Sequence, residues 1–399
     1  MRLIHPTPIL KGLTVLLPFL AFAGNLHAGE IRVGLFYQKE ITSVVFSVVE
    51  GEYIIYGDYR QVGVARKGFI YHVGISADTL TIQDTSAVLG SFGRIEFKGV
   101  SGSNVFRIRP VSPALPSKEL DDNLLIIGDL GLIRAINLID LEKYIAGVVE
   151  SEGGPAAYAE FYKAQAILAR TFAVKNFYRH GTEGYNLCDD QHCQAYNGKS
   201  RMNPVIPAAA LSTEALILYD LHNNPVNPPY HSNCGGMTSD AAWVWGQPMN
   251  HLKPVTDPFC RDSRNATWVS ILGRDEWISY LQSKGFKKEQ LMLTGLNFSP
   301  DTREKYYKLG DRQVELATIR KDLALKSAWF SVTAEGDSII LHGKGYGHGV
   351  GMCQEGAMKM AEKGYVYVDI LHYYFNDVTI GRIAERGQKE SVTPGGLQF

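Results

Sequence analysis

Hydrophobic residues in the first third of the chain come in short runs rich in β-branched and aromatic side chains. Between Ile31 and Ile108 these runs include IRVGLFY and ITSVVFSVV, and Gly, Asp and Ser separate them. Short runs of this kind, bounded by turn residues, are typical of β-strands. The pattern predicts a β-rich region over residues 30–120. The segment Pro110–Asn123, with three prolines and several charges, predicts a linker or a long loop.

Helical spacing replaces this pattern in the middle of the chain. Apolar residues recur at three- and four-residue steps between Glu160 and Arg179, and Arg170 stands in the middle of the resulting face. A buried guanidinium needs a partner, so we expect an acidic group or a wet cleft beside Arg170, unless the side chain reaches solvent at the helix edge. Further helices are expected at 207–214, 352–363 and 368–374, with strands at 216–221 and 338–341.

These elements together predict an α+β fold. It consists of a mixed, β-rich N-terminal part and a helix-plus-sheet part over residues 121–385, followed by a flexible tail at 386–399. At 399 residues the chain is long enough for two or more structural units.

The amino terminus has the pattern of a secretory signal peptide. Arg2 and Lys11 precede the apolar run Leu13–Ala23, which ends in small residues. We expect a signal peptide over residues 1–23, with cleavage after Ala23 or as late as Ala28. An uncleaved anchor is the alternative. The sequence thus predicts an exported protein of the periplasm or cell envelope.

The charge of the chain is nearly balanced, with 40 Lys and Arg against 41 Asp and Glu. No dense basic run is present, so the electrostatic pattern of a nucleic-acid-binding protein is missing. We therefore expect no nucleic-acid partner.

A glycine-rich stretch, GKGYGHGVGMCQEGA, covers Gly343–Ala357. It does not match a dinucleotide-binding loop, because Val350 stands where the third glycine of G-x-G-x-x-G would be, and it holds no G-x-x-x-x-G-K-[ST]. Two interpretations stay open. The stretch connects a strand to a helix, or its glycines let another group approach the backbone closely. His348 is then an ordinary loop histidine or part of a site.

The five cysteines are unevenly spaced. Cys188, His192 and Cys193 lie within CDDQHC and have the side-chain types that bind zinc, but they supply only three ligands. Further ligands could come from a set of three residues: His180, His231 and Cys234. A disulfide and a pair of free thiols are the alternatives, and the odd number of cysteines leaves at least one unpaired.

Five motifs occur in a fixed order in the second part of the chain. They are L-x-x-Y-x-x-G-V-V-x-x-E (Leu141–Glu152), K-A-Q-A-x-x-A-R-T (Lys163–Thr171), C-Q-A-Y-x-G (Cys193–Gly198), H-S-x-C-G-G-x-T (His231–Thr238) and G-Y-G-H-G-V-G-M-x-Q-x-G-A (Gly345–Ala357). In these motifs and in their order the chain resembles the SpoIID/LytB family. The resemblance does not extend to the β-rich region before about residue 120.

The resemblance implies an exported peptidoglycan lytic transglycosylase with a SpoIID-like catalytic domain. Such an enzyme cleaves the MurNAc-GlcNAc glycan strand, mainly strands stripped of peptides, and forms 1,6-anhydroMurNAc. Glu152 would be its general acid and base, while Glu150 matches no motif position. No cofactor is required, and any zinc at the cysteine cluster would be structural.

The LytB branch implies an alternative, a non-catalytic wall-binding enhancer of an N-acetylmuramoyl-L-alanine amidase. The partners implied are glycan strands and a wall amidase or divisome component. A third option is a water-using glycosidase, which needs a second carboxylate from one of three residues: Asp189, Asp190 or Asp240.

The remaining motif residues suit a sugar site. Polar and aromatic side chains can bind hydroxyls and N-acetyl groups or stack on sugar faces. The expected substrate-binding residues are Arg170, Gln194, Tyr196, His231, Ser232, Tyr346, His348 and Gln354, with Trp243 or Trp245 as further stacking residues or as core. Two positions depart from the family pattern. Gly153-Gly154-Pro155 replaces Met-Pro after Glu152, and Glu355 replaces a tryptophan.

Overall fold

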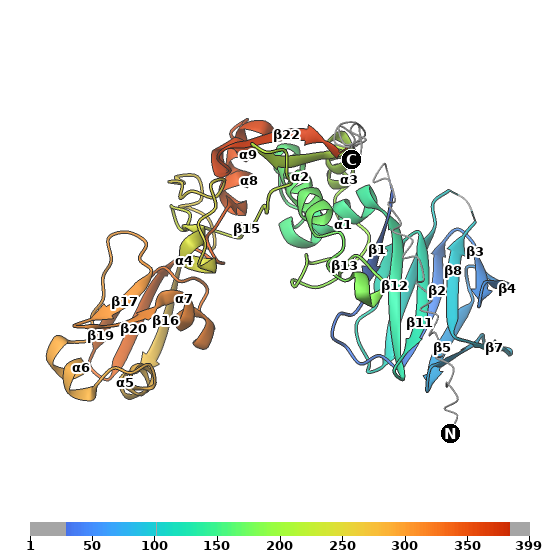
Figure 1. Ribbon diagram of the computed structural model, residues 1–399, viewed down its shortest axis with the longest axis horizontal. Helices are drawn as coiled ribbons and strands as arrows, with labels where there is room; N and C mark the ends of the chain where they lie inside the picture. The colour runs from blue at the N-terminus through green and yellow to red at the C-terminus, as the bar shows by residue number, and fades with distance from the viewer. Residues whose placement is uncertain (1–28, 101, 384–399) are drawn as a thin grey trace, which may run out of the picture.

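The computed structural model describes residues 29–100 and 102–383 (Figure 1). The predicted signal peptide and the predicted tail from 386 lie outside the described residues. Strands and helices share the described part of the chain in several sheets, which confirms the α+β class. Among the described residues, no helix combines the length and the apolar character that a membrane span requires.

Two antiparallel-rich sheets form a sandwich from the N-terminal part of the chain. The larger sheet has the spatial order β13 (Leu187–Cys188), β1 (Glu30–Gly34), β12 (Leu132–Asp140), β11 (Asn123–Asp129), β8 (Arg94–Gly99), β3 (Tyr53–Gly57) and β4 (Arg60–Ala65). The smaller has the order β10 (Lys118–Asp121), β9 (Val105–Ser112), β2 (Ser43–Glu50), β5 (Ile70–Ser76), β6 (Thr79–Gln83) and β7 (Val88–Phe92). Phe46 of β2 stacks on Phe97 of β8 with ring centroids 3.8 Å apart, so the two sheets pack face to face.

The predicted linker over Pro110–Asn123 is wrong, because β9 and β10 form a hairpin there. Two of its prolines lie in the connecting turn. Pro110 lies within β9 and pairs with Val44 next to a register shift of the ladder. Proline has no N–H to donate, and an irregular point of a ladder tolerates that loss. The segment is therefore strand, turn and strand despite its composition.

Helices follow the sandwich directly. Helix α1 (Leu141–Gly153) begins where β12 ends, and the Asp140 carboxylate caps it by accepting from the N–H groups of Glu142 and Lys143 at 2.9 and 3.1 Å. Helices α2 (Ala159–Lys175) and α3 (Val205–Ser212) pack against it, and α8 (Gln354–Glu362) and α9 (Tyr367–Tyr374) pack against α2. The predicted helices in these four regions are confirmed, with small differences at their ends.

Short elements connect the helices. Strand β14 (Leu216–Asp220) pairs with β22 (Val378–Arg382), and β15 (Tyr230–His231) pairs in parallel with β21 (Met352–Cys353). The 3₁₀ turn Gly181–Glu183 follows α2, and α4 (Ala241–Trp245) follows β15. The pairing of β15 with β21 brings together segments more than a hundred residues apart, which carry the fourth and fifth motifs.

The residues between β15 and β21 include a separate unit with its own hydrophobic cluster, which contains Trp277, Tyr307 and Leu341. Its elements are β16 (Thr267–Gly273), α5 (Arg274–Ser283), α6 (Lys288–Thr294), β17 (Tyr306–Leu309), β18 (Arg312–Glu315), α7 (Leu316–Asp322), β19 (Phe330–Glu335) and β20 (Ser338–Lys344). The predicted strand at 338–341 is the start of β20. The domain boundaries at 30–120 and 121–385 stay a prediction.

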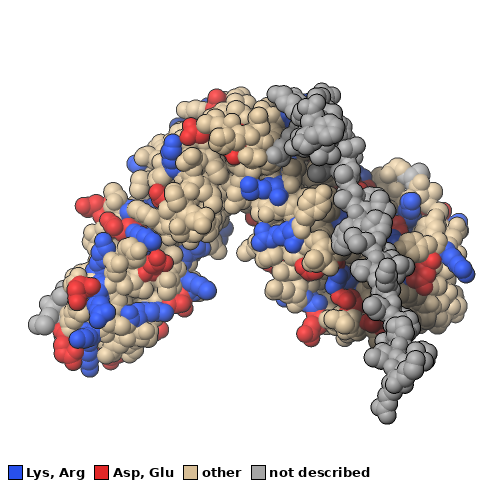
Figure 2. Space-filling model, viewed as in Figure 1, with Lys and Arg blue, Asp and Glu red and all other residues tan. Residues whose placement is uncertain are grey.

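The sandwich, the helices and the inserted unit form an arch (Figure 1). The helices lie at its top, and the sandwich and the inserted unit form its two limbs. Figure 2 shows the concave space between the limbs, with basic side chains on the surfaces that border it.

Candidate active site and metal centre

Glu152 lies in the last turn of α1, where two glycines end the helix. Gly154 has a φ of 68° and donates its N–H to the Glu150 carbonyl at 3.0 Å. A Cβ on Gly153 would lie 2.9 Å from the Phe161 ring of α2. The Gly-Gly pair, which departs from the family pattern, therefore allows the close approach of α2 and leaves Glu152 at the helix end.

The Glu152 carboxyl is half-buried and has two hydrogen-bond donors. The Ala195 N–H donates to its Oε1 at 2.8 Å, and the Tyr230 hydroxyl donates to the same carboxyl. Burial raises the pKa of Glu152 above its ordinary value, and these two hydrogen bonds only partly offset the rise. The negative end of the α1 dipole acts in the same direction as burial. Glu152 is therefore suited to hold a proton and to release it.

Glu150 has a different environment, although it lies only two residues away. Its side chain is buried and accepts from the Ser200 hydroxyl at 3.0 Å and from the N–H groups of Arg201 and Met202 at 3.1 and 2.9 Å. These bonds hold the 200–202 loop against α1. Glu150 thus has a structural role.

The glycine-rich stretch reaches Glu152 by two routes. Gln354 donates to the Glu152 backbone carbonyl at 3.2 Å, which satisfies a carbonyl at the helix end. Tyr230 contacts Glu152 through its hydroxyl, and its own carbonyl accepts from the His348 ring. Tyr230 therefore links Glu152 to His348, through its hydroxyl at one end and its backbone carbonyl at the other, and the site-wall interpretation of the stretch stays a prediction.

Both ring nitrogens of His348 are in use. Nδ1 accepts from the Val350 N–H at 3.1 Å, so the proton is on Nε2, which faces the Tyr230 carbonyl. Burial lowers the pKa of His348 to about 4. His348 is thus a neutral group that holds the shape of the loop.

His231 packs against the same loop. Its ring centroid lies 5.4 Å from that of His348, and its Nδ1 is 3.1 Å from the Val350 carbonyl. Burial lowers its pKa well below the ordinary value, and its Nε2 has no hydrogen-bond partner among the described residues. Gly347 explains the close packing, since a Cβ there would lie 2.7 Å from the His231 Cβ.

Surface aromatic side chains lie near this loop. Trp243, Trp245 and Tyr346 are 36%, 41% and 43% exposed, and the Trp245 ring is 5.4 Å from His348. The two tryptophans are therefore not core residues. Ser232 is half-buried, and its carbonyl accepts from the Glu355 N–H at 3.0 Å.

Glu355, which stands at the departure from the family pattern, joins two loops. Its carboxylate accepts from the side-chain amides of Asn233 and Asn265, each at 2.6 Å.

The structure corrects the expected place of Arg170. The side chain is fully buried and donates to the Glu142 carboxylate and to the carbonyls of Leu216 and Ala210. The acidic partner that the sequence predicts is present, and it is Glu142. Because Arg170 joins α1, α3 and β14 in the interior, it cannot contact a sugar from this position.

Gln194 and Tyr196 are also buried, so they too differ from the expected sugar-binding residues. Gln194 donates to the Ala169 carbonyl at 3.3 Å, and the Tyr196 hydroxyl donates to Asn137 at 3.1 Å. These two bonds hold Ala195 on both sides and so direct its N–H to Glu152. Ala195 and Tyr230 are not among the site residues expected from the sequence. The former lies inside the third motif, and the latter lies one residue before the fourth.

The three aspartates considered as a second carboxylate have other contacts. Asp189 accepts from the Phe36 N–H at 2.8 Å and pairs with Lys118, and Asp240 caps α4. Asp190 accepts from the His192 N–H at 3.4 Å. Among the described residues, no second carboxylate influences the pKa of Glu152.

A four-residue cluster with zinc-binding side chains lies at the start of the third motif. Its ligand atoms, from His180, Cys188, His192 and Cys193, all lie within 4.8 Å of one another. Cys193 Sγ is 3.4 Å from His180 Nε2, and His192 Nδ1 is 3.6 and 3.9 Å from the two sulfurs. Ligands of a tetrahedral zinc site lie roughly 3.4 to 3.8 Å apart, because the metal bonds are about 2.0 to 2.3 Å long. The donor set fits zinc.

The surroundings of this cluster also fit a metal. Glu183 lies 2.6 Å from His180 Nδ1, which leaves Nε2 directed at Cys193. The Cys188 N–H donates to the Cys193 sulfur at 3.4 Å. Of the further ligands that the sequence suggests, His180 belongs to the cluster. His231 contacts the Val350 carbonyl instead, and Cys234 contacts other side chains.

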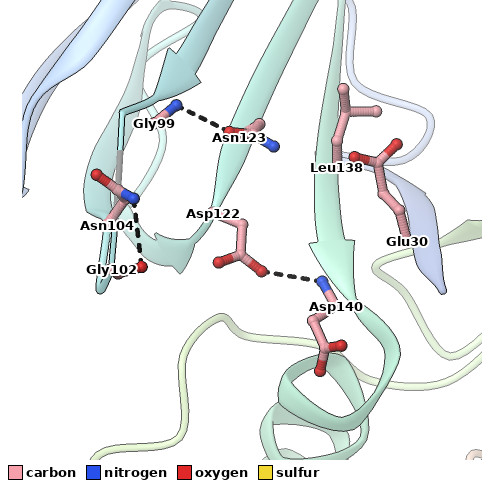
Figure 3. Close-up of a pocket in the computed structure, with 8 residues that line it drawn as sticks. All are labelled: Glu30, Gly99, Gly102, Asn104, Asp122, Asn123, Leu138 and Asp140. Atoms are coloured by element: carbon pink, nitrogen blue, oxygen red, sulfur yellow. Dashed lines mark hydrogen bonds between the residues drawn. The ribbon is translucent and has the colours of Figure 1, made fainter. Parts of the chain in front are cut away.

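A hollow of about 310 Å³ lies elsewhere, at one end of the sandwich (Figure 3). Glu30, Asp122 and Asp140 line it, and the Asp140 N–H donates to the Asp122 carboxylate at 2.9 Å. Since none of the predicted site residues lines this hollow, it does not define the candidate site.

The fold and the site define an α+β protein with a half-buried carboxyl group, Glu152, bonded to a segment that follows a cysteine–histidine cluster. The family model for stage II sporulation protein, SpoIID, matches residues 130–219, a range that contains Glu152 and Ala195. Stage II sporulation protein D of Bacillus subtilis is 30% identical over 264 residues, which cover 62% of this chain and 76% of that protein. The chain belongs to the SpoIID/LytB family.

Two further relatives match much of the same chain. An uncharacterized protein of Brachyspira hyodysenteriae is 30% identical over 251 residues, with 61% of this chain and 67% of that protein covered. A protein of Bacillus subtilis with the name amidase enhancer is 24% identical over 291 residues, which cover 59% of this chain and 40% of that protein.

Proposed function

We propose that this protein is an exported lytic transglycosylase that cleaves peptidoglycan glycan strands, with Glu152 as both acid and base. Membership of the SpoIID/LytB family supports a role related to the cell wall. The observation that carries the catalytic proposal is the half-buried carboxyl group of Glu152, whose pKa burial raises and on which no second carboxylate of the described residues acts.

One carboxyl group is sufficient for this reaction. Protonated Glu152 donates its proton to the glycosidic oxygen as the bond from MurNAc C1 breaks. The resulting carboxylate takes the proton of the C6 hydroxyl on the same MurNAc, and that oxygen bonds to C1. The products are 1,6-anhydroMurNAc and a strand with a free hydroxyl, and the proton is returned to Glu152. A water-using glycosidase needs a second carboxylate, and within the described residues no other carboxylate acts on the pKa of Glu152.

The two donors to Glu152 have a role after the first proton transfer. The Ala195 N–H and the Tyr230 hydroxyl donate to the carboxylate form, which they stabilise at the moment when it becomes charged. Burial meanwhile keeps the resting group protonated to a higher pH than an exposed glutamate. Both effects favour a group that donates and then accepts a proton.

The surface at the glycine-rich loop supports a sugar as the substrate. Trp243, Trp245 and Tyr346 are exposed aromatic groups near the glycine-rich loop, and such groups bind the apolar faces of sugar rings. The basic side chains that border the concave side of the arch suit the carboxylates of a muramic-acid polymer (Figure 2).

We also propose a structural zinc ion held by His180, Cys188, His192 and Cys193. Zinc would supply folding energy by fixing the chain from the end of α2 to the third motif. Ala195 lies two residues after Cys193, so the metal ligands help to hold the N–H that binds Glu152. The proton transfers proposed above are performed by Glu152.

The product of the reaction tests the proposal. Purified protein is incubated with denuded glycan strands and with peptide-bearing strands, and the products are analysed by mass spectrometry. We expect anhydro sugars from wild type and a loss of at least a hundredfold in Glu152→Gln, because the amide can neither donate nor accept the proton. The matched control is Glu214→Gln at an exposed glutamate, which should retain full activity. Anhydro products from Glu152→Gln would overturn the proposal.

The relative with the name amidase enhancer favours a second candidate function, the activation of a wall amidase. In that case the protein binds wall material but releases no sugar. Amidase activity would then rise equally with wild type and with Glu152→Gln, because wall binding does not need the carboxyl group. A wall amidase or a divisome component is then the expected partner.

A further inference from the structure

A second cluster of metal-binding side chains lies on the other side of the candidate site. Its members are Cys234, Asp257, Cys260 and Cys353, all buried, and their ligand atoms lie within 4.8 Å of one another. Cys234 Sγ is 3.4 Å from Cys260 Sγ and 3.2 Å from the Asp257 carboxylate. Cys353 contacts each of the other three side chains. Four donors that all contact one another occupy the corners of a tetrahedron.

Three separate segments supply these ligands. Cys234 follows β15, Cys353 ends β21, and Asp257 and Cys260 come from the loop between α4 and β16. The parallel pairing of β15 and β21 sets His231 opposite Cys353 and so brings two of the cysteines together. No short sequence motif contains this cluster, because its members are spread over more than a hundred residues.

Backbone N–H groups point at the sulfurs, as they do around metal-bound thiolates. Cys353 Sγ accepts from the N–H groups of Cys234 and Gly356 at 3.2 and 3.4 Å. The Gly236 N–H donates to Cys260. Donors of this kind stabilise charged sulfur and orient metal ligands. Gly356 is required there, since a Cβ would lie 2.3 Å from the Asp257 carboxylate.

A cation within the cluster would compensate the charge of an ionised Asp257 and of thiolate sulfurs. Asp257 is fully buried and forms no ion pair with Lys or Arg in the part of the chain that the structure describes. Its oxygens accept from the Tyr374 hydroxyl at 3.0 Å and the Phe259 N–H at 2.9 Å. A buried carboxylate beside three sulfurs is costly without a compensating charge.

Arg303 lies beside the same cluster. Its guanidinium is buried and donates to the carbonyls of Cys234 and Met237 at 2.6 and 2.7 Å. Within the described residues it pairs with no carboxylate. Three thiolates and one carboxylate around a divalent ion have an excess negative charge, which would offset the buried charge of Arg303.

We propose that Cys234, Asp257, Cys260 and Cys353 bind a second zinc ion with a structural role. Three thiolates and one carboxylate oxygen at tetrahedral spacing are a donor set that favours zinc over Mg²⁺ or Ca²⁺, which prefer oxygen ligands. A disulfide is the competing chemistry in an exported protein, but it would use two of the three sulfurs. The third cysteine and Asp257 would then have no common role.

The ion would join β15 to β21 at the candidate site. Tyr230 and His231 form β15, and Gln354 follows Cys353 directly. Tyr230 and Gln354 both hydrogen-bond to Glu152. The zinc would therefore hold the side of the site opposite the third motif, while the first cluster holds the Ala195 side. The role of the ion in holding the candidate site depends on the proposed function, whereas the binding of zinc does not.

Metal analysis of the purified full-length protein tests the proposal. The protein is prepared without reductant or chelator, and zinc is measured by inductively coupled plasma mass spectrometry. We expect two zinc ions per chain, one for each cluster. Cys260→Ser and Cys353→Ser should each lower the content to one. The matched control, Cys188→Ser, should also lower it to one but by loss of the other ion.

Spectroscopy of wild type keeps the test valid if a variant fails to fold. With cobalt(II) in place of zinc, wild type should show intense sulfur-to-cobalt absorption from five thiolates, and Cys188→Ser should retain the part from three. One zinc per chain in wild type, unchanged in Cys260→Ser, would overturn the proposal. A disulfide would also overturn it: the intact mass would be lower by two hydrogens, and a cross-linked peptide would contain Cys234 and Cys260.

The outcome is separate from that of the activity assay. Zinc at both clusters with an active Glu152→Gln variant would support the metal site and contradict the transglycosylase. Anhydro products with a single zinc would do the reverse.

Discussion

Two glutamates in the same helix have opposite environments, and their contacts explain why. Glu150 accepts three hydrogen bonds from the 200–202 loop and is a structural group. Glu152, one half-turn further, lies at the helix end, where burial raises its pKa and only two donors contact it. The residue types in the local sequence, VVESEGG, do not predict this difference, since both carboxyl groups lie in one short stretch and share Ser151 as a neighbour.

A stability measurement can detect the cost of the charged form of Glu152. Because its folded pKa is raised, the folded state binds more protons than the unfolded state, so stability falls as pH rises from about 4.3 to the raised pKa. Glu152→Gln removes this cost. We expect the variant to be more stable than wild type at pH 7 and the difference to vanish at pH 4, as measured by thermal unfolding.

Glu150→Gln is the matched variant for this experiment. Its amide nitrogen would face backbone N–H donors, so we expect a loss of roughly 1–3 kcal/mol in the free energy of unfolding at pH 7. A Glu152→Gln variant that is less stable than wild type at pH 7 would contradict the raised pKa.

Removing the Tyr230 hydroxyl should change the pH dependence of activity. Its hydrogen bond lowers the pKa of Glu152, so in Tyr230→Phe that pKa rises further. The acid form then persists to higher pH, so the alkaline limb of the pH–activity profile moves to higher pH. The maximum rate should fall roughly tenfold, because the carboxylate loses a donor.

The control for this shift is Tyr178→Phe, at a tyrosine that is 72% exposed and is not one of the hydrogen-bond donors to Glu152. Its pH profile should match that of wild type. An alkaline limb that stays in place in Tyr230→Phe would mean that the hydroxyl does not act on Glu152.

At the scale of elements, the short β15–β21 pair organises the site more than any long helix does. It joins the fourth and fifth motifs. The glycine-rich stretch packs closely against His231, because Gly347 has a φ of 111° and no side chain that would meet His231. The glycines therefore serve close packing against His231 and not the binding of a phosphate.

Gly347→Ala should destabilise the protein by about 2 kcal/mol or more. The new Cβ would lie 2.7 Å from the His231 Cβ, in addition to the strain of a positive φ. Gly364→Ala is the matched control, since Gly364 has a φ of 89° but no atom within 4 Å of an added Cβ. It should show only the backbone strain, about 1 kcal/mol. Equal losses in urea unfolding of the two variants would contradict the close packing.

At the scale of the whole molecule, the inserted unit forms one limb of the arch and has a hydrophobic cluster separate from the main core (Figure 1). Its ends are adjacent, because the Gly345 N–H donates to the Ala266 carbonyl at 2.8 Å. A unit with its own core and adjacent ends is a candidate for independent folding.

We expect residues 265–346, produced alone, to unfold cooperatively. Trp268 and Trp277 lie in the separate cluster, so their fluorescence reports its packing during thermal or urea unfolding. A gradual change without a transition, or a spectrum of fully exposed tryptophan, would show that this unit needs the rest of the chain.

The sequence by itself determined many of the elements and indicated the family. The period of the apolar residues is a local property, so the strands of the first region and the helices at 159–175 and 354–362 follow from it. The order of the five motifs is also read along the chain. The linker predicted over Pro110–Asn123 is wrong, because the segment has the composition of a loop but pairs with neighbouring strands in a sheet.

Only the tertiary structure decided which side chains meet. Arg170 pairs with Glu142 in another helix, His180 completes the first cluster, and Cys234 meets Cys353 through the β15–β21 pair. These contacts join residues that are far apart in the chain or whose spacing predicts no contact. Their geometry depends on how complete elements pack, and hydrophobic periodicity does not specify which polar groups that packing brings together.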